Sequence, residues 1–363
     1  FKVYFKFRVR KFMKLFKSLL VAPATLGHLA PLSATANEVT INDFNPAEEL
    51  AVTNSRVDGL EARLNNFEAG SFSETTSASF GSNFYVGAVE SSATGEAVTF
   101  SYDFSMGLST SFTGEDSLDV AVIGGNAGTT AVDGYMGGDN TSDALMLDGI
   151  SYTFPLGGAT VIVGDGVGVD DMNTGACAYS AFTDLVSDCA ANNVGGSADS
   201  GFAIGYDFGN GFTLAGGAAG GVGEDETAGY FTEEDASTIG LEAAYTADTY
   251  GVAIAYTDDE ATTYWTVNAM LAPEGFPSIS VGYETDDDDA DAIFAGLTFD
   301  EVGPGSVSVG IASTATDTND FYQYELSYSY PVNDSMTITP GVFVTETAGE
   351  DDTGFVVTTS FSI

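Results

Sequence analysis

The sequence predicts an all-β chain: a transmembrane antiparallel up-and-down β-barrel of about 16 strands, preceded by a short N-terminal coiled-coil helix. Three observations predict this fold class. Apolar residues recur at every second position beyond Gly70, and short connections alternate with longer ones. Lys and Arg are absent after Arg63, although the chain has 53 Asp and Glu against 9 Lys and Arg.

The alternation is clear where Phe100, Tyr102 and Phe104 are separated by Ser101 and Asp103. Successive side chains of a strand point to opposite faces, so such a segment has one apolar face and one polar or small-residue face. Dividing the region at its turn signals predicts strands at 76–90, 97–112, 117–126, 145–154, 159–167, 200–208, 211–220, 236–246, 249–257, 262–271, 278–285, 291–299, 305–313, 321–330, 335–346 and 353–363.

The connections distinguish the two ends of the predicted barrel. Short turns such as 113–116 alternate with generally longer, more acidic loops such as 127–144 and 168–199. This pattern with an even strand number is typical of bacterial outer-membrane barrels, whose short turns are periplasmic. Both termini are therefore expected on the periplasmic side, with acidic loops facing outward. The longest loop, 168–199, is the best candidate to fold inward. A soluble sandwich would give no reason for this alternation.

The N-terminal region is predicted to be processed. Residues 13–36 combine Lys14 and Lys17, an apolar stretch and an Ala-Thr-Ala tripeptide, which together indicate a secretory signal peptide. Residues 1–12 precede this complete signal and are interpreted as non-native upstream translation. Pro and Gly interrupt the apolar stretch, which disfavours a membrane anchor. The remainder is divided into an irregular segment (37–48), a coiled-coil segment (49–69) and a barrel domain (70–363).

The segment 49–69 has a heptad pattern of apolar and small residues. In this register Arg56 and Arg63 occupy g positions, and Glu61 and Glu68 lie five residues further on at e positions. The pairs Arg56–Glu61 and Arg63–Glu68 are predicted to form between neighbouring chains. The alternative is a single amphipathic helix lying on a protein surface.

The barrel region lacks the residues of common catalytic sites. It contains no His, Lys or Arg, which excludes Ser-His-Asp catalysis and basic phosphate clamps. Neither an enzyme nor a nucleic-acid partner is expected. Cys177 and Cys189 are predicted to form a disulfide rather than remain free, because the chain is routed to an oxidising compartment.

Strand parity places several carboxylates on the polar face of the predicted strands, directed toward the lumen. Without cationic partners they should make the lumen negative, and rings of carboxylates favour cations. The sequence therefore predicts a water-filled, cation-preferring pore. The lumenal candidates are Asp103, Asp119, Asp207, Glu242 and Glu325.

An acidic run offers weak candidates for loosely bound Ca²⁺ or Mg²⁺, namely Asp286, Asp287, Asp288 and Asp289. The alternative is a solvated acidic rim, and no firm metal site or other cofactor is predicted.

Four segments, taken in order, resemble cyanobacterial outer-membrane porins: 56–73 before the barrel, 110–116, the strand and Phe-Pro turn at 150–157, and the hairpin at 330–343. The resemblance implies a homotrimeric barrel in the outer-membrane bilayer that passes ions and small hydrophilic solutes. The S-layer-homology domain of many members is not recognised here, so cell-wall attachment is not expected. Ile363 also stands where the family usually has an aromatic residue.

Two other functions fit the same strand pattern. A non-conducting barrel could act as an outer-membrane scaffold or as a surface adhesin or receptor. A secreted acidic Ca²⁺-binding β-repeat protein would show a fixed repeat, and none is found.

Overall fold

The computed structural model describes residues 76–90, 97–128, 130–184, 189–191, 200–220, 230–232, 237–287, 290–316, 319–346 and 351–363. The predicted signal peptide and coiled-coil segment, with the pairs Arg56–Glu61 and Arg63–Glu68, lie outside these residues. None of the helices among the described residues is long and apolar enough to cross a membrane.

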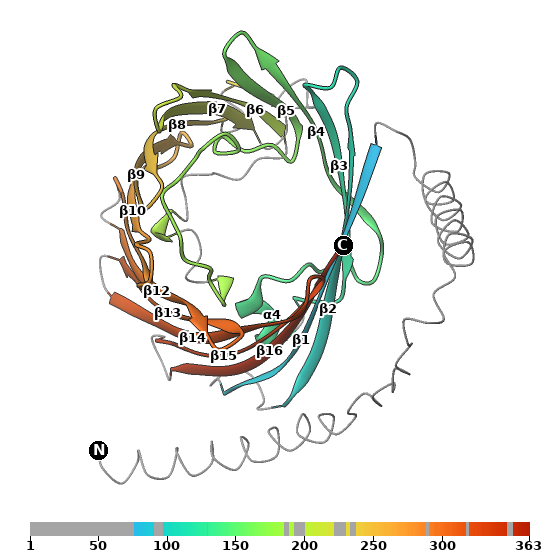
Figure 1. The fold of residues 1–363 in the computed structure, drawn as a ribbon, viewed down its shortest axis with the longest axis vertical. Coiled ribbons are helices and arrows are strands. Elements are labelled where there is room, and N and C mark those ends of the chain that lie inside the picture. Colours follow the sequence, from blue (N-terminus) through green and yellow to red (C-terminus); the bar gives the residue numbers. More distant parts are fainter. Residues whose placement is uncertain are drawn as a thin grey trace, which may run out of the picture. The chain divides into compact units, whose positions relative to one another are not determined.

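The described residues form sixteen antiparallel strands that close into one barrel (Figure 1). Each strand pairs with its neighbours in sequence, and β16 pairs with β1 to complete the ring. The predicted antiparallel barrel of 16 strands is therefore confirmed. The strands are β1 (Thr76–Glu90), β2 (Thr99–Thr110), β3 (Ser117–Gly125), β4 (Met146–Leu156), β5 (Ala159–Asp165), β6 (Ser200–Asp207), β7 (Phe212–Gly220), β8 (Ser237–Ala247), β9 (Tyr250–Asp258), β10 (Thr263–Leu271), β11 (Ser278–Asp286), β12 (Asp291–Val302), β13 (Gly305–Thr316), β14 (Asn319–Asn333), β15 (Met336–Thr345) and β16 (Asp352–Ser362).

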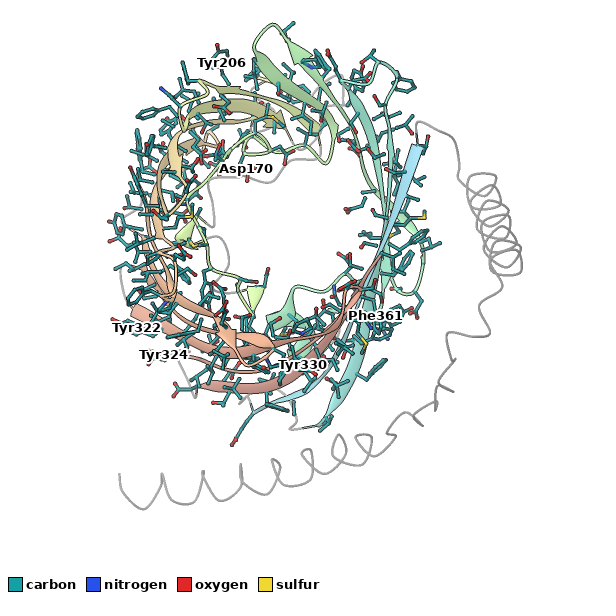
Figure 2. The ribbon with its side chains drawn as sticks, viewed as in Figure 1. Asp170, Tyr206, Tyr322, Tyr324, Tyr330 and Phe361 are labelled. Atoms are coloured by element: carbon teal, nitrogen blue, oxygen red, sulfur yellow. A yellow bond between two sulfur atoms is a disulfide. The ribbon has the colours of Figure 1, made fainter. Side chains whose placement is uncertain are left out.

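The outer and inner faces of the barrel differ in chemistry. On β9, Val252 and Ile254 are exposed at 46% and 44%, whereas Ala253 and Ala255 are buried at 3% and 6%. In Figure 2 the outer surface also holds the labelled side chains of Tyr206, Tyr322 and Tyr324, and Tyr330 and Phe361 are exposed as well. The wall is thus apolar outside and lined mostly by small or polar residues inside, with apolar side chains where loops cover it, as alternation in a barrel strand allows.

Four strands run at least two residues further at their C-terminal ends than the turn signals predicted. β12 reaches Val302 and β13 reaches Thr316, and the other two pass through a proline. β4 continues through Pro155 to Leu156, and β14 continues through Pro331 to Asn333. Proline is tolerated near strand ends and at bulges, where its missing N–H is not needed by the ladder. The pairing of β14 with β15 does shift register between Pro331 and Asn333. Each proline therefore lies at the end of a strand rather than in the turn.

The β3–β4 loop contains one short helix, α4 (Ala131–Met136), that the sequence did not predict. Thr130 and Asp133 form a capping box: the Thr130 N–H donates to Asp133 Oδ2 at 3.0 Å, and the Asp133 N–H donates to Thr130 Oγ1 at 3.4 Å. Gly137 ends the helix with a left-handed φ of 63°. Six residues are too few to show a helical period, which explains why only the cap carries a sequence signal.

This loop also lies elsewhere than expected. The acidic loops were predicted to face outward, but α4 packs Val132 against Tyr85, Val89 and Val356 on the inner wall (Figure 1). The cause is the apolar face of the helix, which leaves water by covering apolar side chains near the ends of β1 and β16.

Candidate pore constriction

The β5–β6 loop follows the inner wall of the barrel, as Figure 1 shows. Its described part comprises residues 166–184 and 189–191. Val167, Val169 and Ala176 are each 1% exposed, so one side of the loop is packed against the wall. The inward folding predicted for 168–199 is found in this described part.

The first contact region between loop and wall is built on β8 and β10. Glu242, 7% exposed, accepts hydrogen bonds from the N–H groups of Thr174 at 2.6 Å and Gly175 at 3.1 Å. Two strands further along the wall, on β10, Asn268 Oδ1 accepts a hydrogen bond from the Ala176 N–H at 2.9 Å. These wall side chains satisfy loop amides that would otherwise be buried without a partner.

The second contact region is a single carboxylate on β14. Glu325, 3% exposed, accepts hydrogen bonds from the Tyr179 hydroxyl (2.8 Å), the Phe182 N–H (2.8 Å), and the Thr183 N–H (2.9 Å) and hydroxyl (2.6 Å). Burial raises the pKa of the Tyr179 phenol, and the charge of Glu325 and its hydrogen bond raise it further. The phenol therefore stays protonated and donates. Four donors on one carboxylate compensate its removal from water.

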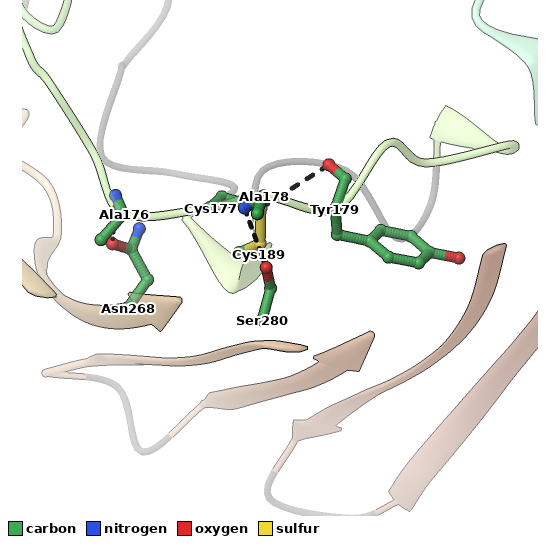
Figure 3. Close-up of a disulfide and its surroundings, with 7 residues drawn as sticks. All are labelled: Ala176, Cys177, Ala178, Tyr179, Cys189, Asn268 and Ser280. Atoms are coloured by element: carbon green, nitrogen blue, oxygen red, sulfur yellow. Dashed lines mark hydrogen bonds between the residues drawn. A yellow bond between two sulfur atoms is a disulfide. The ribbon is translucent and has the colours of Figure 1, made fainter. Parts of the chain in front are cut away.

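A disulfide joins Cys177 to Cys189 between these two contact regions, with their Cα atoms 6.0 Å apart (Figure 3). The Ala178 N–H, beside Cys177, donates to Ser280 Oγ on β11 at 2.8 Å. Cys189 is fully buried against the wall, whereas Cys177 is exposed. The disulfide therefore ties a loop segment that wall hydrogen bonds already hold.

The β3–β4 loop meets the β5–β6 loop inside the barrel. Phe182 belongs to the same apolar cluster as Val132 of α4. Tyr135 packs on Phe343, with ring centroids 4.6 Å apart, and its hydroxyl donates to Asp352 Oδ2 at 2.5 Å. Two loops, rather than the single one predicted, are therefore folded against the inner wall.

A carboxylate lies beneath the β3–β4 loop as well. Asp103, 6% exposed, accepts from the Tyr85 hydroxyl at 2.5 Å and from the Asn83 side chain at 2.9 Å. Burial raises the pKa of Asp139 in this loop, and the charges of Asp103 and Asp148 raise it further.

The five predicted lumenal acids are thus found in three kinds of environment. Asp103, Glu242 and Glu325 are buried acceptors of the hydrogen bonds described above. Asp119 lines a cavity and accepts from Ser117 Oγ at 2.6 Å. Asp207 is exposed beside the β6–β7 turn, where it accepts from the Gly209 N–H at 2.7 Å.

Other acids of the β5–β6 loop are exposed to solvent. Asp170, Asp171 and Asp184 are exposed on the β5–β6 loop, and Figure 2 shows Asp170 on the lumenal side of this loop. Asp171 and Asp119 also line a cavity of about 610 Å³ along β1–β5, together with Asp148 and Asp165. The loop acids could have been found from the sequence by selecting the carboxylates of the loop predicted to fold inward.

The two described residues of the candidate divalent-ion run, Asp286 and Asp287, accept hydrogen bonds from nearby backbone N–H groups. Asp286 Oδ1 accepts from the Ala290 N–H at 2.8 Å, and Asp287 Oδ1 accepts from the Thr263 N–H at 2.9 Å. Asp288 and Asp289 lie outside the described residues. Among the residues that are described, no three His, Cys, Asp or Glu side chains are grouped to hold a metal ion.

Comparison with known proteins identifies similar barrels. No family model matches the chain. An uncharacterized protein of Nostoc, alr4550, is 35% identical over 136 residues, covering 34% of this chain and only 23% of that protein's length.

Among solved structures, OprB of Pseudomonas putida at high pH has a TM-score of 0.61 at 11% identity, covering 80% of this chain and 94% of that one. An anion-selective porin from Comamonas acidovorans has a TM-score of 0.60 at 15% identity, covering 79% and 100%. A mutant of the porin of Rh. blastica has a TM-score of 0.58 at 14% identity, with the same coverage. The chain therefore has the fold of bacterial porins.

Proposed function

We propose that this chain forms a water-filled channel in an outer membrane, through which ions and small hydrophilic solutes diffuse passively with a preference for cations. The observation that carries the proposal is the placement of exposed carboxylates on both the β5–β6 loop and the facing wall. Asp170 represents the first group and Asp148 the second. No Lys or Arg occurs in the sequence after Arg63 to offset them. Carboxylates lining a narrow aqueous path raise the local concentration of cations and repel anions.

The exposed apolar outer face supports a place in a lipid bilayer, because side chains such as Leu241 and Val281 are exposed at 57% and 45%. Periplasmic termini and a homotrimer follow from the loop pattern and the resemblance noted in the sequence. The similarity to an anion-selective porin concerns the fold alone. Ion preference depends on which side chains line a pore, so one barrel architecture accommodates either sign.

The reversal potential of the reconstituted protein in a planar bilayer under a KCl gradient tests the ion preference. We expect the sign that corresponds to K⁺ permeation. The double substitution Asp170→Asn with Asp148→Asn should move the reversal potential toward zero. Glu115→Gln, which removes an exposed carboxylate from the short β2–β3 turn, is the matched control and should leave it unchanged. Anion preference of the unmodified protein would overturn the proposal.

A non-conducting scaffold or receptor is the second candidate, and the presence of two loops inside the barrel favours it. The two functions differ in one measurement. A channel gives discrete conductance steps on reconstitution, whereas a closed barrel gives none although it inserts into the bilayer. Closure in three steps would additionally support the proposed trimer.

A further inference from the structure

The inner wall beneath the β5–β6 loop carries glycine at the places where the loop comes closest. Val169 of the loop lies over Gly217 of β7 and Gly240 of β8. A Cβ added at Gly217 would be 2.9 Å from Val169 Cα, and one at Gly240 would be 2.6 Å from Val169 Cγ2. Real Cβ atoms do not approach other heavy atoms so closely, so a side chain at Gly240 would displace the loop, and one at Gly217 would displace the loop and press on the Phe202 carbonyl of β6 at 2.7 Å.

The same relation continues along the loop. A Cβ at Gly282 of β11 would overlap the backbone carbonyl of Cys189, and one at Gly296 of β12 would overlap the Tyr179 ring. At Gly310 of β13 the nearest atom would be the Tyr179 hydroxyl at 2.6 Å. A Cβ at Gly341 of β15 would likewise meet the ring of Phe182.

These glycines are unfavourable for the strands themselves. Glycine in a strand interior has no side chain to pack and loses more conformational entropy on folding than any other residue. Not every inner-wall glycine lies in such a contact. A Cβ at Gly107 of β2 would meet only the hydroxyl of Ser79, at 2.7 Å, which can rotate away. Other wall glycines, such as Gly87 of β1, are close only to a neighbouring strand, so what the six glycines described above share is that a Cβ there would meet atoms of the loop.

We propose that Gly217, Gly240, Gly282, Gly296, Gly310 and Gly341, here called the glycine seat, are positioning residues that set how far the β5–β6 loop projects into the lumen. The seat lets the loop backbone lie directly on the wall, within hydrogen-bond reach of Glu242 and Glu325. This inference rests on the proposed channel function, because the depth of the loop sets the width and the charge of the path.

The substitution Gly240→Ala tests the seat at one end of the loop, and Gly310→Ala tests it at the other. Each added methyl group should push the loop away from the wall. We expect a loss of single-channel conductance in both variants, together with faster amide hydrogen exchange at Thr174 and Ala178 in Gly240→Ala. Gly107→Ala is the matched control, with parent conductance expected. Heat-dependent migration on denaturing gels reports whether each barrel has closed.

A rescue experiment separates positioning from a general effect on the strand. Val169→Gly removes both side-chain atoms that the added methyl group would meet, Cγ2 at 2.6 Å and Cβ at 2.8 Å, so combining it with Gly240→Ala should restore conductance toward that of Val169→Gly alone. A closed Gly240→Ala barrel with parent conductance and parent exchange would overturn the inference, as would a double variant no better than Gly240→Ala. If the parent protein forms no channel, the channel proposal fails, and unchanged amide exchange in Gly240→Ala would then refute the seat independently.

Discussion

The substitution Glu325→Gln should release the far end of the β5–β6 loop. The Glu325 carboxylate accepts four hydrogen bonds, two on each oxygen. Glutamine keeps one oxygen, but its NH₂ group would face two donors and accept from neither. Hydrogen bonds to charged groups contribute about 1.5–3 kcal/mol each, so losing two should lower the local stability of the loop by about 3–6 kcal/mol. The strands themselves keep their ladder hydrogen bonds.

Amide hydrogen exchange at Phe182 and Thr183 measures this change, because local opening of the loop governs it. A loss of about 3 kcal/mol corresponds to exchange faster by about 100-fold or more. Channel recordings should show more current noise as the loop fluctuates. Asp170→Asn removes a carboxylate from the exposed side of the same loop and serves as the control for charge alone. Unchanged protection of Phe182 and Thr183 in Glu325→Gln would refute the assigned role of the carboxylate.

Three further predictions concern other contacts. A hydrogen bond from the Tyr152 hydroxyl is the largest cause that lowers the pKa of Asp116, and one from a turn N–H is the next. The ionised carboxylate therefore stabilises the fold fully above the ordinary carboxyl pKa, and this stabilisation is lost as the pH falls through the lowered pKa. Asp116→Asn should therefore lower the thermal stability of the barrel at pH 7, and the deficit should shrink in strong acid; an equal deficit at both pH values would contradict this. The double substitution Cys177→Ser with Cys189→Ser should lower loop stability by about 2–3 kcal/mol, seen as faster exchange in the β5–β6 loop, while K⁺ preference persists; a reversed ion preference would count against the wall contacts as the main support. Tyr135→Phe keeps the ring on Phe343 but loses the hydrogen bond to Asp352, so unfolding should cost about 1 kcal/mol less, and a larger loss would indicate that α4 has detached.

The barrel could be predicted from the sequence because a strand with one apolar and one small-residue face repeats with period two. On β9, the alternation of Val252 and Ile254 with Ala253 and Ala255 is visible in both the sequence and the exposures. Turn signals were less reliable, since Pro155 and Pro331 are tolerated inside strand ends. The helix α4 was missed because its single apolar face is too short to show a period.

The site was harder to predict. The alternation along a strand predicts whether a side chain faces the lumen or the membrane, but it does not reveal which loop covers that side chain. Parity directed Glu242 and Glu325 toward the lumen, and both do lie on the inner face of the wall. Nothing in the spacing of the strands reveals that the β5–β6 loop supplies the donors to both carboxylates. The donor to Glu242 is 68 residues away in the sequence, and a donor to Glu325 is 143 residues away. The exposed acids of the loop were accessible to sequence reasoning, since they share the segment predicted to fold inward.

The closure of the ring has a consequence for biogenesis. Phe80 and Ile363 exchange backbone hydrogen bonds of 3.1 and 3.0 Å across the β1–β16 seam. Until this pairing forms, β1 and β16 both present unpaired strand edges, which are templates for aggregation. The seam joins segments at opposite ends of the described chain, and contacts of such long sequence separation form slowly. The β1–β16 pairing removes every strand edge from the finished ring, but before it forms two edges remain open. A partly assembled barrel of this kind therefore needs protection from aggregation until the ring has closed.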